Sequence, residues 1–196
     1  EKDRLYHTLN KIKKKQKLHH ATNQLWSYAV NCNEQHAIHI AHAIIEHAVQ
    51  QKVHCIVFEH LDMKGKIYGK KKQKLAMWRK QYIQGLVTHK AHQQGIRISR
   101  ICAWGTSKLA YDGSGETTRN KDNHSICKFA NNKVYNCDLS ASYNIGARYY
   151  IREILKNLPV RVRSQVEAKV PQLAKRTSCT LSTLINLNAV LKSNAL

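Results

Sequence analysis

The segment Val53-His-Cys-Ile-Val-Phe58, with Glu59 directly after it, carries the clearest information about the fold of this chain. It is short, almost entirely apolar and rich in β-branched residues, which is typical of a strand buried on both faces of a sheet flanked by helices. Because open α/β sheets bind ligands at the carboxyl ends of their strands, the carboxylate of Glu59 is a candidate functional group.

Helical periodicity is found on both sides of this predicted strand. Upstream, apolar residues repeat every three or four positions over residues 37–51, which predicts an amphipathic helix capped by Asn31 or Asn33. Downstream, a second helix is expected over residues 75–94, and the alternation over residues 96–103 predicts a second strand. The order helix, strand, loop, helix, strand predicts an α/β layer fold.

The remaining chain divides by composition. Residues 104–137 are rich in Gly, Asn and Asp, which predicts a turn-rich insertion with one hairpin, and a helix is expected to resume at Asp138 and to stop before Pro159. The last segment predicts a further helix near its end. We therefore expect four parts, over residues 1–103, 104–137, 138–157 and 158–196.

The charge is strongly basic, with 33 Lys and Arg against 12 Asp and Glu, a formal net charge of +21. Clustered cations bind polyanions by releasing counterions, so nucleic acid is the expected partner. Residues 1–20 predict a basic helix, and residues 64–80 predict a basic loop without any carboxylate. The candidate nucleic-acid-binding residues in these two segments are Lys13, Lys14, Lys15, Lys70, Lys71, Lys72, Lys74 and Arg79.

Composition also excludes several classes of protein. Hydrophobic residues make up 42% of the chain in periodic blocks, which argues against intrinsic disorder. No apolar run approaches the ~20 residues that span a bilayer, and no secretory signal is visible. The six cysteines are scattered, which favours reduced, buried thiols and a cytoplasmic protein. The first residue is Glu1, so we expect the chain to be a fragment or a processed product.

Two of the twelve carboxylates stand out by context. Glu59 ends the predicted buried strand, and Asp138 opens a long helix, although Asp at that position also serves as a simple helix cap. Mg²⁺ is commonly held by one or two carboxylates together with substrate phosphates, and paired ions catalyse phosphodiester hydrolysis. The pattern therefore suggests a Mg²⁺ or Mn²⁺ site formed by Glu59 and Asp138.

Three segments of the sequence resemble motifs of a known family. Cys55-Ile-Val-Phe-Glu-His-Leu61 is similar to the second RuvC motif of TnpB proteins, the transposon-encoded RNA-guided nucleases related to type V CRISPR effectors. Cys137-Asp-Leu-Ser-Ala-Ser-Tyr-Asn-Ile145 resembles the third motif, and Trp104-Gly-Thr-Ser107 lies where the family has a Thr-Ser before its zinc ribbon. The resemblance covers about residues 1 to 157. It implies an RNase H-like (RuvC) fold, cleavage of DNA under RNA guidance, and metal ligation by Glu59 and Asp138.

Two departures from the family pattern change what is expected. The first RuvC motif, with its catalytic Asp, has no counterpart, and Asp3 lies in a helical, charged context; we expect an N-terminally incomplete domain with little or no cleavage by itself. The ribbon lacks its paired cysteines and keeps only Cys127 and Cys137, with His124 and Cys102 as possible recruits. This favours a degenerate, zinc-free ribbon.

That remnant is expected to be held by an apolar cluster of Tyr111, Phe129 and Val134. Two alternatives to the nuclease remain open. One is a nuclease-dead nucleic-acid-binding protein of the same descent, and the other is an unrelated basic RNA-binding structural protein.

Overall fold

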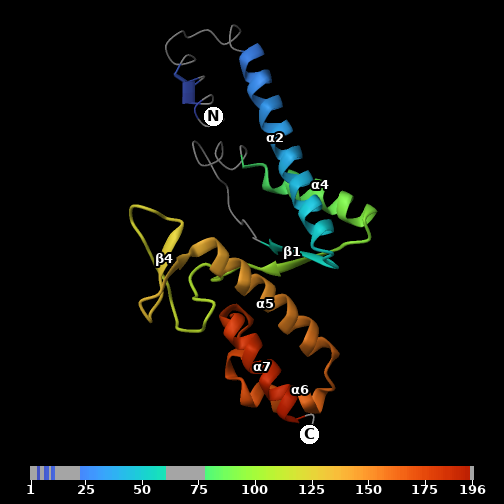
Figure 1. Cartoon of the computed structure of the whole chain (residues 1–196), viewed down its shortest axis with the longest axis vertical. Helices are drawn as coiled ribbons and strands as arrows, with labels where there is room; N and C mark the ends of the chain where they lie inside the picture. The colour runs from blue at the N-terminus through green and yellow to red at the C-terminus, as the bar shows by residue number, and fades with distance from the viewer. Residues whose placement is uncertain (1–3, 5–6, 9, 12–22, 61–77, 195–196) are drawn as a thin grey trace. The chain divides into compact units, whose positions relative to one another are not determined.

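The computed structural model describes residues 4, 7–8, 10–11, 23–60 and 78–194, and it shows a mixed α/β protein (Figure 1). The chain forms two compact units. The first comprises Glu1–Ile56 with Lys64–Ile98, and the second comprises Val57–Met63 with Ser99–Leu196.

The first unit is built on two packed helices, α2 (Asn23–Gln50) and α4 (Lys80–Gln93). The buried stripe of α2 consists mainly of alanines, and α4 presents Val87 and Ala91, both fully buried. Small side chains allow two helix backbones to approach closely, so alanine at these positions favours tight packing of the pair. The buried residues of the α2 stripe are Ala29, Asn33, Ala37, Ala41, Ile45 and Ala48.

Both helices begin at positions that differ from the prediction. The expected caps Asn31 and Asn33 lie inside α2, because the buried stripe continues upstream through Asn33 to Ala29. The expected start at residue 75 lies outside the described residues. Within them α4 begins at Lys80, because Arg79 has a left-handed backbone (φ 50°) that a continuous helix cannot accommodate.

The strands β1 (Cys55–His60) and β2 (Arg97–Cys102) form a two-stranded parallel sheet. The amide of Arg97 donates to the carbonyl of His54 at 3.0 Å, and that of Ala103 donates to His60 at 3.3 Å, in the same direction along both strands. Burial alternates along β2, where Ser99 and Ile101 face inward.

No residue of β1 is fully buried, so the prediction of a strand buried on both faces is wrong. Within the described ranges, β1 pairs only with β2. A sheet of two strands leaves more of its faces accessible than the flanked, many-stranded sheet that the apolar run suggested.

The insertion is more regular than predicted. Its strands β3 (Thr118–Arg119), β4 (Ile126–Lys128) and β5 (Val134–Asn136) form an antiparallel sheet in the order β3-β4-β5. Two successive hairpins therefore replace the single one expected. Val134 does not belong to the predicted apolar cluster, because its side chain is 64% exposed on an edge strand, whereas Phe129 packs with Ala110, Cys127 and Cys137, with Tyr111 and Tyr135 against them.

The helix α5 (Cys137–Asn157) ends before Pro159, as predicted, and the chain continues as α6 (Val160–Lys169), two short 3₁₀ turns and α7 (Leu181–Asn194). These helices bury one apolar core, which α5 shares with the last 40 or so residues. Its buried members are Ile151, Leu155, Val166, Val170, Leu173, Cys179 and Leu187. No helix in the described ranges has both the length and the apolar character needed to cross a membrane.

Candidate functional site

Glu59 occupies the next-to-last position of β1 and is partly buried. The carbonyl of the next residue, His60, accepts a hydrogen bond from the amide of Ala103, just past the end of β2. Glu59 therefore lies at the carboxyl end of the β1–β2 pair, the end at which α/β sheets bind ligands.

Asp138 lies in the first turn of α5 but does not cap the helix. The cap is Asn136, whose side-chain oxygen accepts hydrogen bonds from the amides of Asp138 at 2.9 Å and Leu139 at 3.0 Å. The Asp138 side chain is exposed, and its carboxylate has no hydrogen bond or ion pair with any residue that the structure describes. Asn136 thus fills the capping role that the sequence alone allowed for Asp138.

Arg148 fixes α5 against the end of the sheet. Its Nη1 donates to the carbonyls of Cys102 at 3.0 Å and Trp104 at 2.9 Å, on either side of the Ala103 amide that bonds to His60. The helix carrying Asp138 is therefore anchored at the same end of the second unit as Glu59. Asp138 precedes Arg148 by ten residues, which is a rise of about 15 Å along the helix.

The two carboxylates match Mg²⁺ in donor type, because Mg²⁺ prefers oxygen ligands and often takes only one or two from protein. The exposed, unengaged carboxylate of Asp138 is available for such a role. The described residues contain no group of three or more His, Cys, Asp or Glu side chains arranged to hold a metal ion. A third protein ligand is thus not found in the part of the chain that the structure describes.

Asn144 is a positioning residue that sequence reasoning did not identify. It is fully buried on α5, donates to the carbonyls of Thr106 at 3.0 Å and Leu109 at 2.9 Å, and accepts from the amide of Leu181 at 3.2 Å. It therefore joins the exit from β2, the helix of Asp138 and the start of α7. Polar residues at positions 140, 144 and 148 within an otherwise apolar helical stripe were the available signal.

Of the predicted nucleic-acid-binding residues, the structure describes only Arg79. Its guanidinium lies 3.7 Å from the Glu34 carboxylate and stacks over Tyr82, whose hydroxyl donates to Glu34 at 3.0 Å. That hydrogen bond raises the pKa of Tyr82. Arg79 thus contributes to the contact between α2 and α4. The other predicted residues, Lys13–Lys15, Lys70–Lys72 and Lys74, lie outside the described residues, as does most of the predicted basic helix.

A cluster of tyrosines near the start of α5 was also not identified from the sequence. The ring of Tyr111 lies 5.1 Å from that of Tyr135 and 5.2 Å from that of Tyr143, and Lys133 stands over both Tyr111 and Tyr135. Lys133 donates to the Tyr111 hydroxyl at 2.6 Å, which raises the pKa of the lysine. Tyr143 is exposed and follows Asp138 by five residues. Partly exposed rings with an adjacent cation are suited to stacking on bases.

The two cysteines of the expected ribbon remnant are both buried. The six cysteines of the chain are all free, and Cys127 and Cys137 lie in the small core of the insertion, whereas Cys32 and Cys102 are exposed. Burial, followed by a hydrogen bond with Cys137, raises the pKa of Cys127 to about 11. Cys127 and Cys137 are therefore core residues of the insertion.

Comparison with known proteins adds no relative to this picture. No protein-family model matches the sequence. A search of the curated proteins likewise found none that matches significantly.

Proposed function

We propose that this chain is the RuvC-like portion of a TnpB-type, RNA-guided DNA endonuclease, in which Glu59 and Asp138 hold Mg²⁺ or Mn²⁺. The observation that supports the proposal most is the placement of the two carboxylates. Glu59 lies at the carboxyl end of a parallel strand pair. Asp138 is an unengaged carboxylate in the first turn of the helix that Arg148 anchors to that end, about 15 Å along the helix from the anchor.

The order of elements supports the same proposal. The elements follow one another along the chain in this order: a strand with Glu at its next-to-last position, a helix, a parallel strand, an inserted antiparallel sheet, and a helix with an Asp in its first turn. This order agrees with an RNase H-like arrangement interrupted by a degenerate ribbon.

In this proposal each group has a distinct role. When bound, the metal activates water and stabilises the leaving oxygen of the phosphodiester. Glu59 and Asp138 supply oxygen ligands, and Arg148 and Asn144 keep the helix of Asp138 in position. The basic segments around residues 13–15 and 70–74 bind the nucleic-acid backbone, and the guide RNA provides the target sequence.

Metal binding is the most direct test. We expect Mn²⁺, followed by electron paramagnetic resonance, to bind the wild-type chain, and Glu59→Gln and Asp138→Asn each to weaken that binding strongly. Asp122→Asn is the matched control, since it removes an exposed carboxylate of the insertion. Unchanged Mn²⁺ affinity in both site variants would refute the assignment.

Cleavage provides the second test. We expect the chain by itself to cleave DNA weakly or not at all, and the protein with its guide RNA and Mg²⁺ to cleave. In that complex Glu59→Gln should abolish cleavage and leave DNA binding intact, because the change removes a ligand and keeps the side-chain shape.

The alternative is a nuclease-dead nucleic-acid-binding protein of the same descent. The finding that favours it is the absence of a three-residue metal-binding group among the described residues. It predicts nucleic-acid binding that is unaffected by EDTA, together with no specific Mn²⁺ binding. Mn²⁺ bound by the wild type and lost in Glu59→Gln would exclude this alternative.

A further inference from the structure

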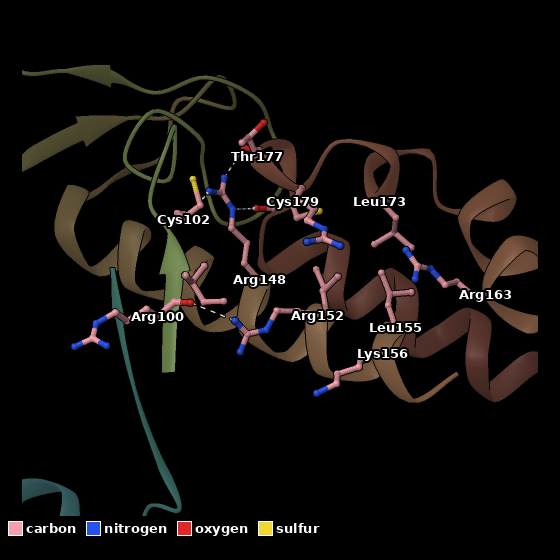
Figure 2. Close-up of a pocket in the computed structure, with 13 residues that line it drawn as sticks. Arg100, Cys102, Arg148, Arg152, Leu155, Lys156, Arg163, Leu173, Thr177 and Cys179 are labelled. Carbon is pink, nitrogen blue, oxygen red and sulfur yellow. Dashed lines mark hydrogen bonds between the residues drawn. The ribbon is translucent and has the colours of Figure 1, made fainter. Parts of the chain in front are cut away.

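A cavity of about 390 Å³ lies between β2, α5 and the C-terminal helices, within the second unit (Figure 2). Its apolar wall includes Ile151, Leu155 and Leu173, all buried. The volume falls in the range of about 300–1,000 Å³ that is typical of small-molecule sites.

The charged residues that line this cavity are all basic. Five Lys and Arg side chains come from α5, α6 and the turn after it, namely Arg148, Arg152, Lys156, Arg163 and Arg176. Arg100 also lines the cavity, but its guanidinium points away in Figure 2. No Asp or Glu is part of the lining.

Only two of these five cations are neutralised. Arg152 pairs with Glu153 at 2.9 Å, and Arg163 pairs with Glu167 at 2.8 Å. Arg148, Lys156 and Arg176 have no carboxylate partner among the residues that the structure describes. The cavity therefore keeps three uncompensated positive charges.

Arg148 gives the most specific indication of a ligand. It is only 6% exposed, and among the described residues its guanidinium donates only to backbone carbonyls: those of Cys102, Trp104, Thr177 and Cys179. Carbonyl dipoles satisfy the N–H groups but do not neutralise the charge. A buried cation without a counter-ion is costly, and an anion in the adjacent cavity would reduce that cost.

We propose that this cavity binds a nucleotide 5′-phosphate, with the phosphate among the basic side chains and the nucleoside against the apolar wall. Arginine guanidinium groups match phosphate oxygens in geometry, which favours phosphate over other anions. Three unpaired cations also suit a doubly charged phosphomonoester better than a singly charged carboxylate or an internal phosphodiester. The ligand is either a free nucleotide or the 5′-phosphorylated end of a strand.

The test compares two oligonucleotides that differ only at the 5′ end. Both carry a fluorophore at the 3′ end, and their binding to the whole chain is followed by anisotropy in EDTA. We expect the 5′-phosphorylated strand to bind about tenfold more tightly than the 5′-hydroxyl strand, from the loss of charge-assisted contacts.

The variants Lys156→Ala/Arg176→Ala should abolish that difference, since both residues are exposed and carry unpaired charge in the cavity lining. Arg161→Ala/Lys192→Ala is the matched control, because it removes the same charge from exposed positions on α6 and α7 outside the cavity and should preserve the difference. Equal binding of the two strands by the wild type, or a difference that persists in the cavity variant, would overturn the proposal.

Competition identifies the source of the phosphate. Displacement of the phosphorylated strand by a nucleoside 5′-monophosphate supports a free nucleotide, whereas the same preference without displacement supports a strand end. Displacement by dodecanoate together with no 5′-phosphate preference would overturn the proposal in favour of a fatty acid site. Because EDTA removes divalent metal, this experiment does not depend on the metal site. The 5′-phosphate preference can be absent while Mn²⁺ binding is confirmed, and it can be present while Mn²⁺ binding is refuted.

Discussion

Replacing Arg148 with Met should destabilise the second unit more than any single surface change. The side chain is 6% exposed, and its guanidinium holds carbonyls from the exit of β2 and from the segment before α7. Met keeps much of the apolar volume but provides no donor, so four acceptors lose their partner.

The magnitude follows from two opposing contributions. Each buried acceptor left unpaired costs about 1–3 kcal/mol, and removal of the guanidinium returns its own desolvation penalty. Burial lowers the pKa of Arg148, in line with such a penalty. Because the cavity lets water reach some of the freed carbonyls, we expect a net loss of about 3–5 kcal/mol, comparable to breaking a buried ion pair. The melting temperature should fall by about 10 °C in a chain of this size.

The assay is urea denaturation followed by circular dichroism, with Arg161→Met as the control. Arg161 is exposed on α6, so its replacement should change the free energy of unfolding by less than about 0.5 kcal/mol. Arg148→Lys should lose about half as much as Arg148→Met, because an ammonium group cannot reach carbonyls on both sides. A loss below about 1 kcal/mol for Arg148→Met would refute the idea that this residue holds the three segments together.

Three further predictions concern other parts of the chain. Asn144→Ala should cost about 2–4 kcal/mol in urea denaturation, since it leaves two carbonyls and one amide without their partner, and wild-type stability would contradict this. The folded protein holds the pKa of Cys127 at about 11, above its ordinary value of 9.0, so this thiol contributes stability below pH 9.0 that is lost as the pH rises towards 11. Urea midpoints of the wild type should therefore fall more steeply over that window than those of Cys127→Ala, and parallel curves would exclude the effect. Replacing Lys70, Lys71 and Lys72 with Gln should reduce the slope of log affinity for DNA against log salt by about 2–3, and an unchanged slope would remove these residues from the interface.

The sequence was most informative where the hydrophobic period was regular. The second strand, the long helix before Pro159 and the last helix all lie within a few residues of their predicted ranges, because each carries an uninterrupted apolar alternation or stripe. Helix starts were less predictable. Asn33 is a typical capping residue but is buried inside α2. The left-handed backbone of Arg79 could not be predicted, because arginine is not a residue type that favours this conformation.

Long-range polar contacts could not be predicted from the sequence. Asn144 and Arg148 each bond to segments 29 or more residues away on both sides, and nothing in the local pattern indicates which carbonyls they meet. The cavity depends on the same tertiary arrangement. The positions of Glu59 and Asp138 relative to the predicted strand and helix were enough to select them as candidates. From the sequence, Asp138 could also have been a helix cap. The structure shows that Asn136 is the cap instead.

The C-terminal segment after residue 157 determines whether the protein could be truncated or exchanged at that point. The family resemblance ends near residue 157, yet Leu173 and Leu187 complete the core of α5, and Thr177 and Cys179 provide half of the carbonyls around Arg148. A chain cut at residue 157 would expose Ile151 and Leu155 to water. The last 39 residues are therefore not a detachable module: a genetic exchange at that point would have to supply a new cover for α5 in the same step.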